Sequence, residues 1–291
     1  MTLSELFKQK SFIITAELPP PKGTSIQKMT GIARSVRGMV DGINITDNQR
    51  SIMRMSALAF SHLIKDTGNE PIMQICCRDR NRIALQSDIL GAAALNINNL
   101  CIMTGDHTTL GDHPEAKPVF DIDSIQLMLM VRNMENGKTL SGKGLVSKPS
   151  FSLGGVVNPF AEPFDFQLIK LKKKVQAGAE FFQTQPFFDL ESILNFLEAV
   201  EDIKAKFLIG ITPLKSFKTI QFLNKNVLTK PIPESISERI AKSNCQEMEG
   251  IKIAAELIHE IKNKADKIDG VHIMPIGVEK LLPNLLELIS Q

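Results

Sequence analysis

Short apolar runs recur along the chain at fairly even intervals, and amphipathic stretches of helical period separate them. Each run is continuously apolar and rich in β-branched or aromatic residues, which is typical of parallel strands covered on both faces. The predicted strands are Phe12–Ala16, Gly42–Thr46, Pro71–Cys76, Leu100–Thr104, Phe151–Val157, Phe181–Thr184, Phe207–Ile211 and Val271–Met274. The clearest helical stretches are Ser51–Lys65, Asn81–Leu95, Asp121–Met134, Phe166–Ala177, Leu190–Ile203 and Ile251–Lys264. This alternation predicts an α/β fold, a (β/α)8 TIM barrel in a single domain over residues 1–291.

An open doubly wound sheet is the alternative architecture. No G-x-G-x-x-G motif follows the first predicted strand, which disfavours the dinucleotide-binding form of that sheet. Thr2–Glu5 and Ser235–Glu238 each have the spacing of a capping box and predict helix starts. Gly178 follows Lys172–Lys174 and predicts a helix end. The Gly-, Ser- and Lys-rich stretch Asn136–Ser150 predicts a mobile loop within the domain.

Charge and cysteine content exclude several classes of protein. The 291 residues hold 34 Lys and Arg against 32 Asp and Glu, and this near balance argues against a nucleic-acid binder. The four cysteines lack the paired spacing of a zinc site and are interpreted as reduced residues, mostly in the core. The N-terminus has no apolar signal core, and no apolar run reaches the about 18 residues of a membrane span. We therefore expect a cytoplasmic protein without a metal site.

Polar residues stand at the ends of most predicted strands. In a (β/α)8 barrel, the site lies where the carboxyl ends of the strands meet. The strand-end residues are Glu17, Thr46, Asp47, Arg78, Asp79, Asp106, His107, Asn158, Gln185 and Thr212. We expect these side chains to converge at one mouth, although polar residues also follow strands in chains without such a site.

Two carboxylates at strand ends are candidates for catalysis. Glu17 ends the first apolar run and precedes three prolines, and burial at an apolar strand mouth would favour the protonated form that a general acid needs. Asp106 follows Gly105, whose permissive backbone allows a flat ligand to approach closely. The alternatives are a solvated loop glutamate and an ordinary turn aspartate. A metal held by His107 and His113 with the aspartates beside them is a less favoured hypothesis.

The block AGAEFFQTQPFFD places the amides Gln183 and Gln185 beside two phenylalanines at a strand end. Amides can bind the donor and acceptor edge of a heterocycle, and a phenyl ring offers a stacking face. Alternatively, Gln183 points outward and the rings fill the layer between helices and strands. Lys170 and Lys172–Lys174 form a solvated helix face, or one of them reaches a phosphate.

Taken together, these motifs resemble the methylenetetrahydrofolate reductase family. The resemblance is carried by ITAELPPPKG, NITDN, CCRDRN, TGDH and KKKVQAGAEFFQTQPFFD and extends from about Phe12 to Glu287. It implies a flavoprotein barrel that reduces 5,10-methylenetetrahydrofolate to 5-methyltetrahydrofolate, in one-carbon metabolism and methionine biosynthesis. The implied cofactor is FAD, with FMN as the alternative.

The resemblance also implies roles for single residues. Glu17 matches the general acid that protonates a substrate nitrogen, and Asp106 matches a carboxylate that stabilises the resulting cation. Gln185 and Phe217 match substrate-binding positions, the first for the pterin and the second for stacking. The residues interpreted as cofactor-binding are Thr46, Gln74, Thr104, Gly105, Asp106, Phe120, Asn158, Lys170 and Lys174.

Four positions depart from the family pattern. Gln74 replaces a histidine, Thr104 an arginine and Asn158 an aromatic residue, while Gly277 stands where a substrate-contacting arginine is expected. The departures resemble the branch of anaerobes with a reductive one-carbon pathway. The implied partners are a tetrahydrofolate substrate, NAD(P)H or a reduced electron carrier, a small metal-bearing companion subunit and a second copy of the chain. A flavin-free reductase, a methyl-transferring pterin-binding barrel and a scaffold subunit of a one-carbon complex stay open as alternatives.

Overall fold

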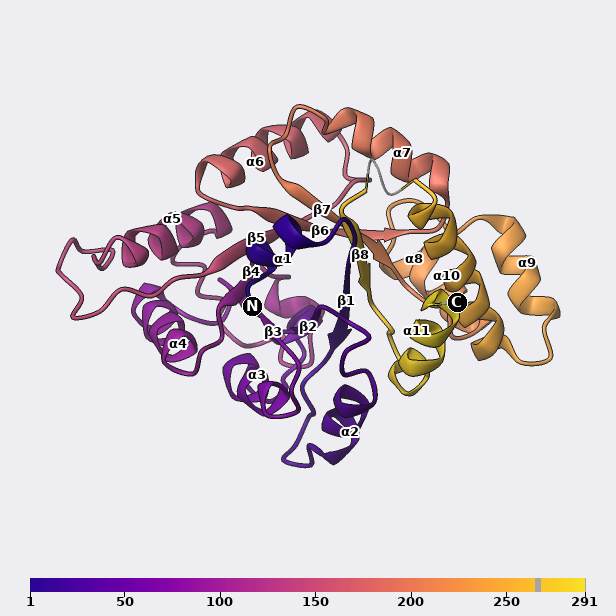
Figure 1. Cartoon of the computed structure of the whole chain (residues 1–291), viewed down its shortest axis with the longest axis horizontal. Helices are drawn as coiled ribbons and strands as arrows, with labels where there is room; N and C mark the ends of the chain where they lie inside the picture. The colour runs from indigo at the N-terminus through magenta and orange to yellow at the C-terminus, as the bar shows by residue number, and fades with distance from the viewer. Residues whose placement is uncertain (265–267, 291) are drawn as a thin grey trace.

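Eight parallel strands close into a barrel at the centre of the molecule (Figure 1). The computed structural model describes residues 1–264 and 268–290. The strands are β1 (Ile13–Leu18), β2 (Gly42–Ile45), β3 (Pro71–Cys76), β4 (Asn99–Met103), β5 (Ser152–Val157), β6 (Phe181–Phe187), β7 (Lys206–Ile211) and β8 (Gly270–Ile273). The predicted barrel is confirmed. The open-sheet alternative is wrong, because β8 pairs with β1 along its whole length.

Helices surround the barrel and alternate with the strands (Figure 1). They are α1 (Leu3–Gln9), α2 (Gln27–Ser35), α3 (Ala57–Lys65), α4 (Arg82–Ala94), α5 (Ser124–Glu135), α6 (Phe164–Gln176), α7 (Leu190–Ala199), α8 (Phe217–Asn226), α9 (Glu234–Lys242), α10 (Gln246–Lys262) and α11 (Leu282–Ser290), with the short 3-10 turns η1 (Gln49–Ser51), η2 (Thr108–Leu110) and η4 (Glu279–Leu281). Each predicted helical stretch contains a helix. The helix expected from Ser51 begins only at Ala57, because Arg50 and Ser51 have φ values of 57° and 58°, which an α-helix does not include.

The helix-end predictions have mixed outcomes. Thr2 and Glu5 form the predicted capping box of α1. Gly178 follows α6 with φ 100°, as expected at a helix end. Ser235 does not cap a helix, because α9 has already begun at Glu234, after Pro233. Proline suits that boundary, since a helix start needs no backbone N–H there.

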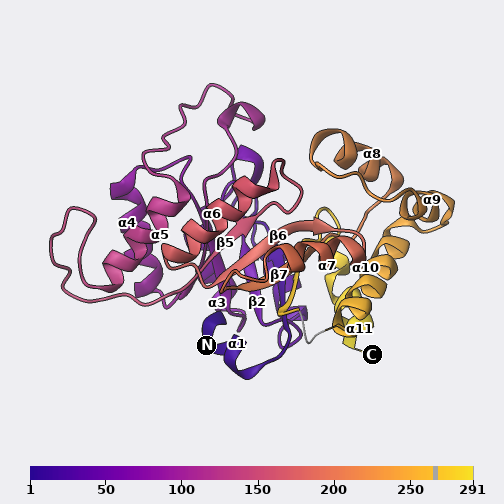
Figure 2. The ribbon, with the colours of Figure 1, turned by 90° about the horizontal axis from the view of Figure 1, so that it is seen from above.

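Helix α1 covers the N-terminal end of the barrel. Its residue Leu3 is buried against Ile13, Ile72 and Phe181 inside the barrel. Figure 2 shows α1 on one side of the strands, with α8 and the long β4–α5 loop on the opposite side. A ligand that reaches the barrel interior would therefore enter at the C-terminal mouth.

The barrel interior changes from apolar to polar toward that mouth. Above the apolar layer packed on α1, Asn44 of β2 and Gln183 of β6 exchange two hydrogen bonds, of 3.1 and 3.2 Å. Both side chains are buried. Because this pair spans the barrel, the interpretation in which Gln183 points outward is wrong. Because the two amides hydrogen-bond each other, Gln183 has a structural role as the partner of Asn44.

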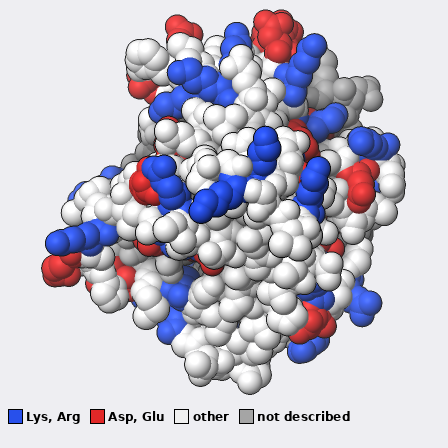
Figure 3. Space-filling model, turned by 90° about the vertical axis from the view of Figure 1, so that its left-hand side faces the viewer, with Lys and Arg blue, Asp and Glu red and all other residues white. Residues whose placement is uncertain are grey.

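The outer face beside α4, α5 and the loop after α5 carries charges of both signs (Figure 3). Lys and Arg are interspersed there with Asp and Glu, with uncharged surface between them. Among the helices in the described ranges, none combines the length and the apolar character that crossing a membrane requires.

The cysteines differ in reactivity. Cys76, Cys77 and Cys101 are buried, whereas Cys245 is exposed. Burial raises the pKa of each of the three buried thiols to about 12, so they stay protonated near neutral pH. We expect the native protein to react rapidly at one of its four thiols with an aromatic disulfide reagent, and at all four once unfolded. Cys245→Ser is expected to abolish the rapid phase, and a second rapid thiol would contradict this expectation.

Candidate active site

Glu17 lies inside β1 rather than after it, because the backbone pairing with β2 continues to Leu18. Its side chain points to the interior and the residue is only 5% exposed. One carboxylate oxygen accepts a hydrogen bond from Gln49 Nε2 at 3.2 Å, and the other lies 3.9 Å from His272 Nε2. The predicted carboxylate is therefore buried at the mouth between two polar side chains.

His272 is a site residue that the sequence analysis did not identify. It lies buried in β8, opposite Thr15 of β1 in the strand register. Its Nδ1 is 2.9 Å from Thr15 Oγ1, while its Nε2 faces Glu17. Since Thr15 and Glu17 share the inward face of β1, pairing the first and last strands was the signal that could have identified this contact.

A cleft of about 230 Å³ opens over Glu17. Its lining residues are Glu17, Pro19, Gln49, Arg54, Pro275, Ile276, Gly277 and Glu279. Gly277 has no side chain, so this wall lacks the arginine that the resemblance implies. Arg54 brings a guanidinium to the cleft and is held there by Pro20 O at 3.0 Å.

A network of ion pairs joins the loops after β2 and β3. Arg78 bonds both carboxylate oxygens of Asp79 at 2.7 Å each. Arg80 bonds Asp47 and also Asp88, the latter at 2.8 Å. Burial raises the pKa of Asp47, and Arg80 together with the Cys76 backbone N–H opposes that rise. Asp47, Arg78 and Asp79 were predicted from the sequence as strand-end residues without a role, whereas Arg80 and Asp88 were not identified.

The turn at Gly105 after β4 has a left-handed backbone, with φ 92°. A Cβ at this position would lie 3.0 Å from Cys76 Sγ, so the close approach requires glycine. Asp106 follows with an exposed side chain, and its backbone oxygen accepts a hydrogen bond from Arg78 Nη1 at 3.1 Å.

The predicted cofactor-binding residues include one unsatisfied hydroxyl. Within the described residues, Thr46 Oγ1 is buried and has no hydrogen-bond partner, a state that a bound ligand can relieve. Gln74 is buried in β3, on the inward face. Thr104 is tied to Ser124 at the start of α5 by a 3.2 Å hydrogen bond between their hydroxyls.

The lysines of α6 divide into two kinds. Lys174 Nζ donates to Val156 O at 2.7 Å, and desolvation lowers the pKa of this ammonium. Lys170 is exposed. On the same side of the mouth, Asn158 Oδ1 accepts from Phe160 N at 3.0 Å, and Phe120 stacks on His107 with ring centroids 6.4 Å apart.

The predicted substrate residues belong to other strands. Gln185 is exposed in β6, where the register with β7 shifts. Phe217 begins α8, is 37% exposed, and its N–H donates to Gln246 at 3.0 Å. The predicted cofactor residues thus belong to β2 to β5, to the loops after them and to α6, whereas Gln185, Phe217 and Glu17 belong to β6, to the start of α8 after β7 and to β1. In the closed strand order, β2 to β5 and β6 to β1 are two contiguous halves of the mouth.

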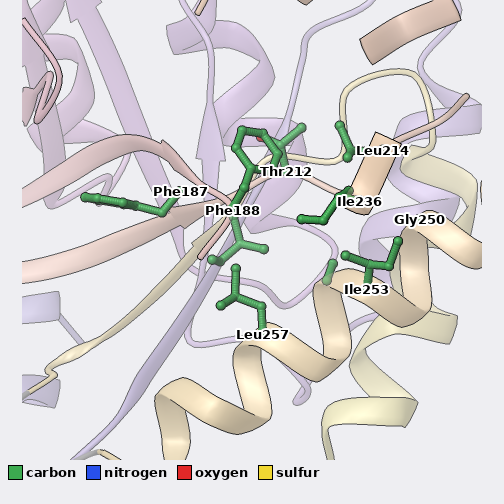
Figure 4. Close-up of a pocket in the computed structure, with 10 residues that line it drawn as sticks. Phe187, Phe188, Thr212, Leu214, Ile236, Gly250, Ile253 and Leu257 are labelled. Atoms are coloured by element: carbon green, nitrogen blue, oxygen red, sulfur yellow. The ribbon is translucent and has the colours of Figure 1, made fainter. Parts of the chain in front are cut away.

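A second, smaller cavity lies between α10 and the ends of β6 and β7 (Figure 4). Its volume of about 10 Å³ holds at most one water, and its walls are mainly apolar. A Cβ at Gly250 would stand 1.8 Å from Leu214 O, so α10 packs directly against the segment leading to α8. This cavity is packing space between α9, α10 and the strand ends rather than a ligand site.

The two histidines of the metal hypothesis have separate partners. His107 Nδ1 is 2.9 Å from Thr109 Oγ1, and His113 Nδ1 is 3.1 Å from Asp112. Within residues 1–264 and 268–290, no group of three His, Cys, Asp or Glu side chains is placed to hold a metal ion.

The closed parallel barrel defines an α/β-barrel protein, and the buried carboxylate at its mouth is a candidate site at the C-terminal face. The family model described as "Methylenetetrahydrofolate reductase" matches residues 2–290. The chain therefore belongs to the methylenetetrahydrofolate reductase family.

Individual relatives are distant. A 5,10-methylenetetrahydrofolate reductase of Pectobacterium carotovorum is 23% identical over 209 residues, which cover 71% of this chain and 63% of that protein. The Salmonella typhimurium protein of the same name is 24% identical over 70% of this chain and 62% of its own length. The chain thus matches less than two thirds of the length of these relatives. A Clostridium thermocellum structure, described as binding two copies of 5-methyl-5,6,7,8-tetrahydrofolic acid, superposes with a TM-score of 0.63, covers 98% of both chains and is 16% identical.

Proposed function

We propose that this chain reduces 5,10-methylenetetrahydrofolate to 5-methyltetrahydrofolate with the help of a bound flavin. Family membership supports this reaction, as do the names of the bacterial relatives. The observation that carries the proposal is the carboxylate of Glu17, buried at the base of a cleft and contacted by Gln49 and His272. This burial argues against a solvated loop residue and supports the role of a proton donor.

Glu17 protonates the substrate nitrogen, so that the five-membered ring opens to a cationic iminium. Gln49 and His272 orient the carboxyl group, and Thr15 holds His272 in turn. The exposed carboxylate of Asp106 stabilises the positive charge that develops on the substrate. Phe217 and Gln185 align the pterin from the other half of the mouth.

The residues at β2 to β5 fit a flavin. Thr46 offers the unsatisfied hydroxyl, and Lys174 offers a cation beside β5. When bound, the flavin supplies the hydride for the reduction. The cofactor is FAD, with FMN as the alternative, and the product serves one-carbon metabolism and methionine biosynthesis.

The remaining parts of the proposal concern the surroundings of the enzyme. Residues 1–291 act as one catalytic unit in the cytoplasm. The electrons come from NAD(P)H or a reduced carrier protein. The chain works as a homo-oligomer and, in the branch that it resembles, beside a small metal-bearing subunit.

A flavin-free reductase is the second candidate. The Clostridium thermocellum neighbour is described as binding two copies of 5-methyl-5,6,7,8-tetrahydrofolic acid, and that description names no flavin. Lys174, moreover, already donates to Val156 O. Chromatography of the supernatant after denaturing the purified protein separates the two candidates. Released FAD or FMN, with the protein's absorption band near about 450 nm, supports the flavin enzyme. A colourless, active protein overturns it in favour of the second candidate.

Substitutions at the substrate half test the proposed binding roles. Phe217→Ala is expected to raise the folate KM by about 5- to 150-fold, because loss of one stacking contact costs about 1–3 kcal/mol. Gln185→Ala should raise KM and lower kcat, since a misplaced pterin is misaligned for hydride transfer. Phe166→Ala is the control, because it removes another exposed ring, 60% exposed against 37% for Phe217, from α6 on the cofactor side. Unchanged folate kinetics in both test variants would place the substrate elsewhere.

A further inference from the structure

The long loop between β4 and α5 carries Asp106, and one residue at the end of β3 contacts both of its arms. Arg78 Nη1 donates to Asp106 O at 3.1 Å on the outgoing arm. Arg78 O accepts from Val119 N at 2.7 Å on the returning arm. We propose that Arg78 is a positioning residue that fixes this loop, and with it the Asp106 carboxylate, at the mouth. The inference rests on the proposed function, which gives Asp106 its role.

The guanidinium of Arg78 is itself rigidly held. The residue is 2% exposed, and Nε and Nη2 bond the two oxygens of Asp79 at 2.7 Å each. Nη2 also donates to Asn48 O at 3.1 Å in the loop after β2. A planar guanidinium fixes the directions of its donors, so these bonds set the position of the Asp106 bond as well. Arg78 thereby ties the loops after β2 and β4 to the end of β3.

The packing around Gly105 independently brings the loop onto Arg78. A Cβ at Gly105 would lie 3.4 Å from Arg78 Cβ, so the backbone of the loop rests directly on this residue. Among the residues that the structure describes, no side chain bonds or pairs with the Asp106 carboxylate. Its place is therefore set through its own main chain, which Arg78 anchors.

A double-mutant cycle tests the proposal on the full chain, with the rate of methylenetetrahydrofolate reduction by the reduced protein as the readout. Arg78→Lys keeps the charge but cannot make the forked bond and both carbonyl bonds at once. We expect it to slow this step by about 10- to 100-fold, as misplacement of a catalytic group does. Asp106→Asn should slow the same step. The rate of the double variant should lie within about twofold of the rate of Asp106→Asn. Both substitutions remove the same contribution, which is the charge of Asp106 at its correct place.

Arg132→Lys is the matched control. Arg132 bonds Glu135 and Glu180 at 2.6 Å each and the carbonyl of Gly178, at the opposite end of the barrel. It should reduce stability while leaving the rate within about twofold. Losses that multiply in the double variant, or a wild-type rate in Arg78→Lys, overturn the positioning proposal and leave the role of Asp106 intact. A wild-type rate in Asp106→Asn overturns both. Should Arg78→Lys fail to fold, Asp79→Asn takes its place in the same cycle, with the same expected and overturning results.

Discussion

Glu17→Gln is expected to slow the reduction of methylenetetrahydrofolate by about 10²- to 10⁴-fold, the usual contribution of a general acid. The amide keeps the shape of the side chain and can still bond Gln49, but its N–H protons are too weakly acidic to be transferred to the substrate nitrogen. Flavin content and reduction of the flavin by its electron donor should stay unchanged, because neither step needs that proton. Separate stopped-flow measurements of the two half-reactions check this expectation.

Glu279→Gln is the control for that experiment. Glu279 lines the same cleft, but its carboxylate accepts a hydrogen bond from Gly277 N at 3.0 Å in the loop after β8. Removing its charge alters the electrostatics of the cleft without touching the proposed proton donor. Reduction of the folate should therefore stay within a few-fold of wild type. Equal losses in both variants would reduce Glu17 to one of several charges in the cleft.

Asp47→Ala is expected to lower the free energy of unfolding by about 3 kcal/mol, because it leaves the Arg80 cation, whose side chain is only 20% exposed, without its closest partner. Asp47 is 6% exposed, and it accepts hydrogen bonds from Arg80 and from Cys76 N, the latter at 2.9 Å. Arg80 would keep only Asp88, which places the expected loss at the lower end of the range for buried pairs. Urea unfolding curves of variant and wild type measure the difference.

Asp88→Ala is the control, because it removes the other partner of the same guanidinium. Its side chain is 29% exposed, and ion pairs near the surface contribute about 1 kcal/mol or less. The free energies of unfolding of the two variants should therefore differ by about 2 kcal/mol, and Asp47→Ala should be the less stable variant. Equal losses would show that burial of Asp47 adds nothing to the pair.

The strands of the barrel were predictable because each is a short apolar run covered on both faces. The predicted strand Pro71–Cys76 coincides with β3, and the other predicted boundaries differ by a few residues at most. The segment after β2 was predicted less well. The sequence pattern predicts a helix from Ser51. Asn48, Arg50 and Ser51 have positive φ values, however, and the helix begins only at Ala57. Asn48 bonds Asp79 at 3.2 Å and Arg50 lies over the ring of Phe222, and no local pattern in the sequence records contacts with such distant residues.

Candidate site residues could be predicted from the sequence, but the side chains that they contact could not. Glu17 and Gly105 were identifiable because each breaks an apolar run in a way that a strand or a regular turn does not require. His272 and Gln49 were missed, since their contacts to Glu17 depend on barrel closure and on the path of a loop. Arg78 was noticed only as a strand-end residue, because the carbonyls that it bonds belong to loops far away in the chain.

A single-turnover experiment tests the central claim most directly. The purified protein is reduced without oxygen and mixed with 5,10-methylenetetrahydrofolate, while flavin absorbance near about 450 nm and the folate products are followed together. We expect the flavin to be reoxidised as one equivalent of 5-methyltetrahydrofolate forms, and Glu17→Gln to fail at this step. A reduced flavin that persists beside unchanged methylenetetrahydrofolate would contradict the proposed flavin-dependent reduction.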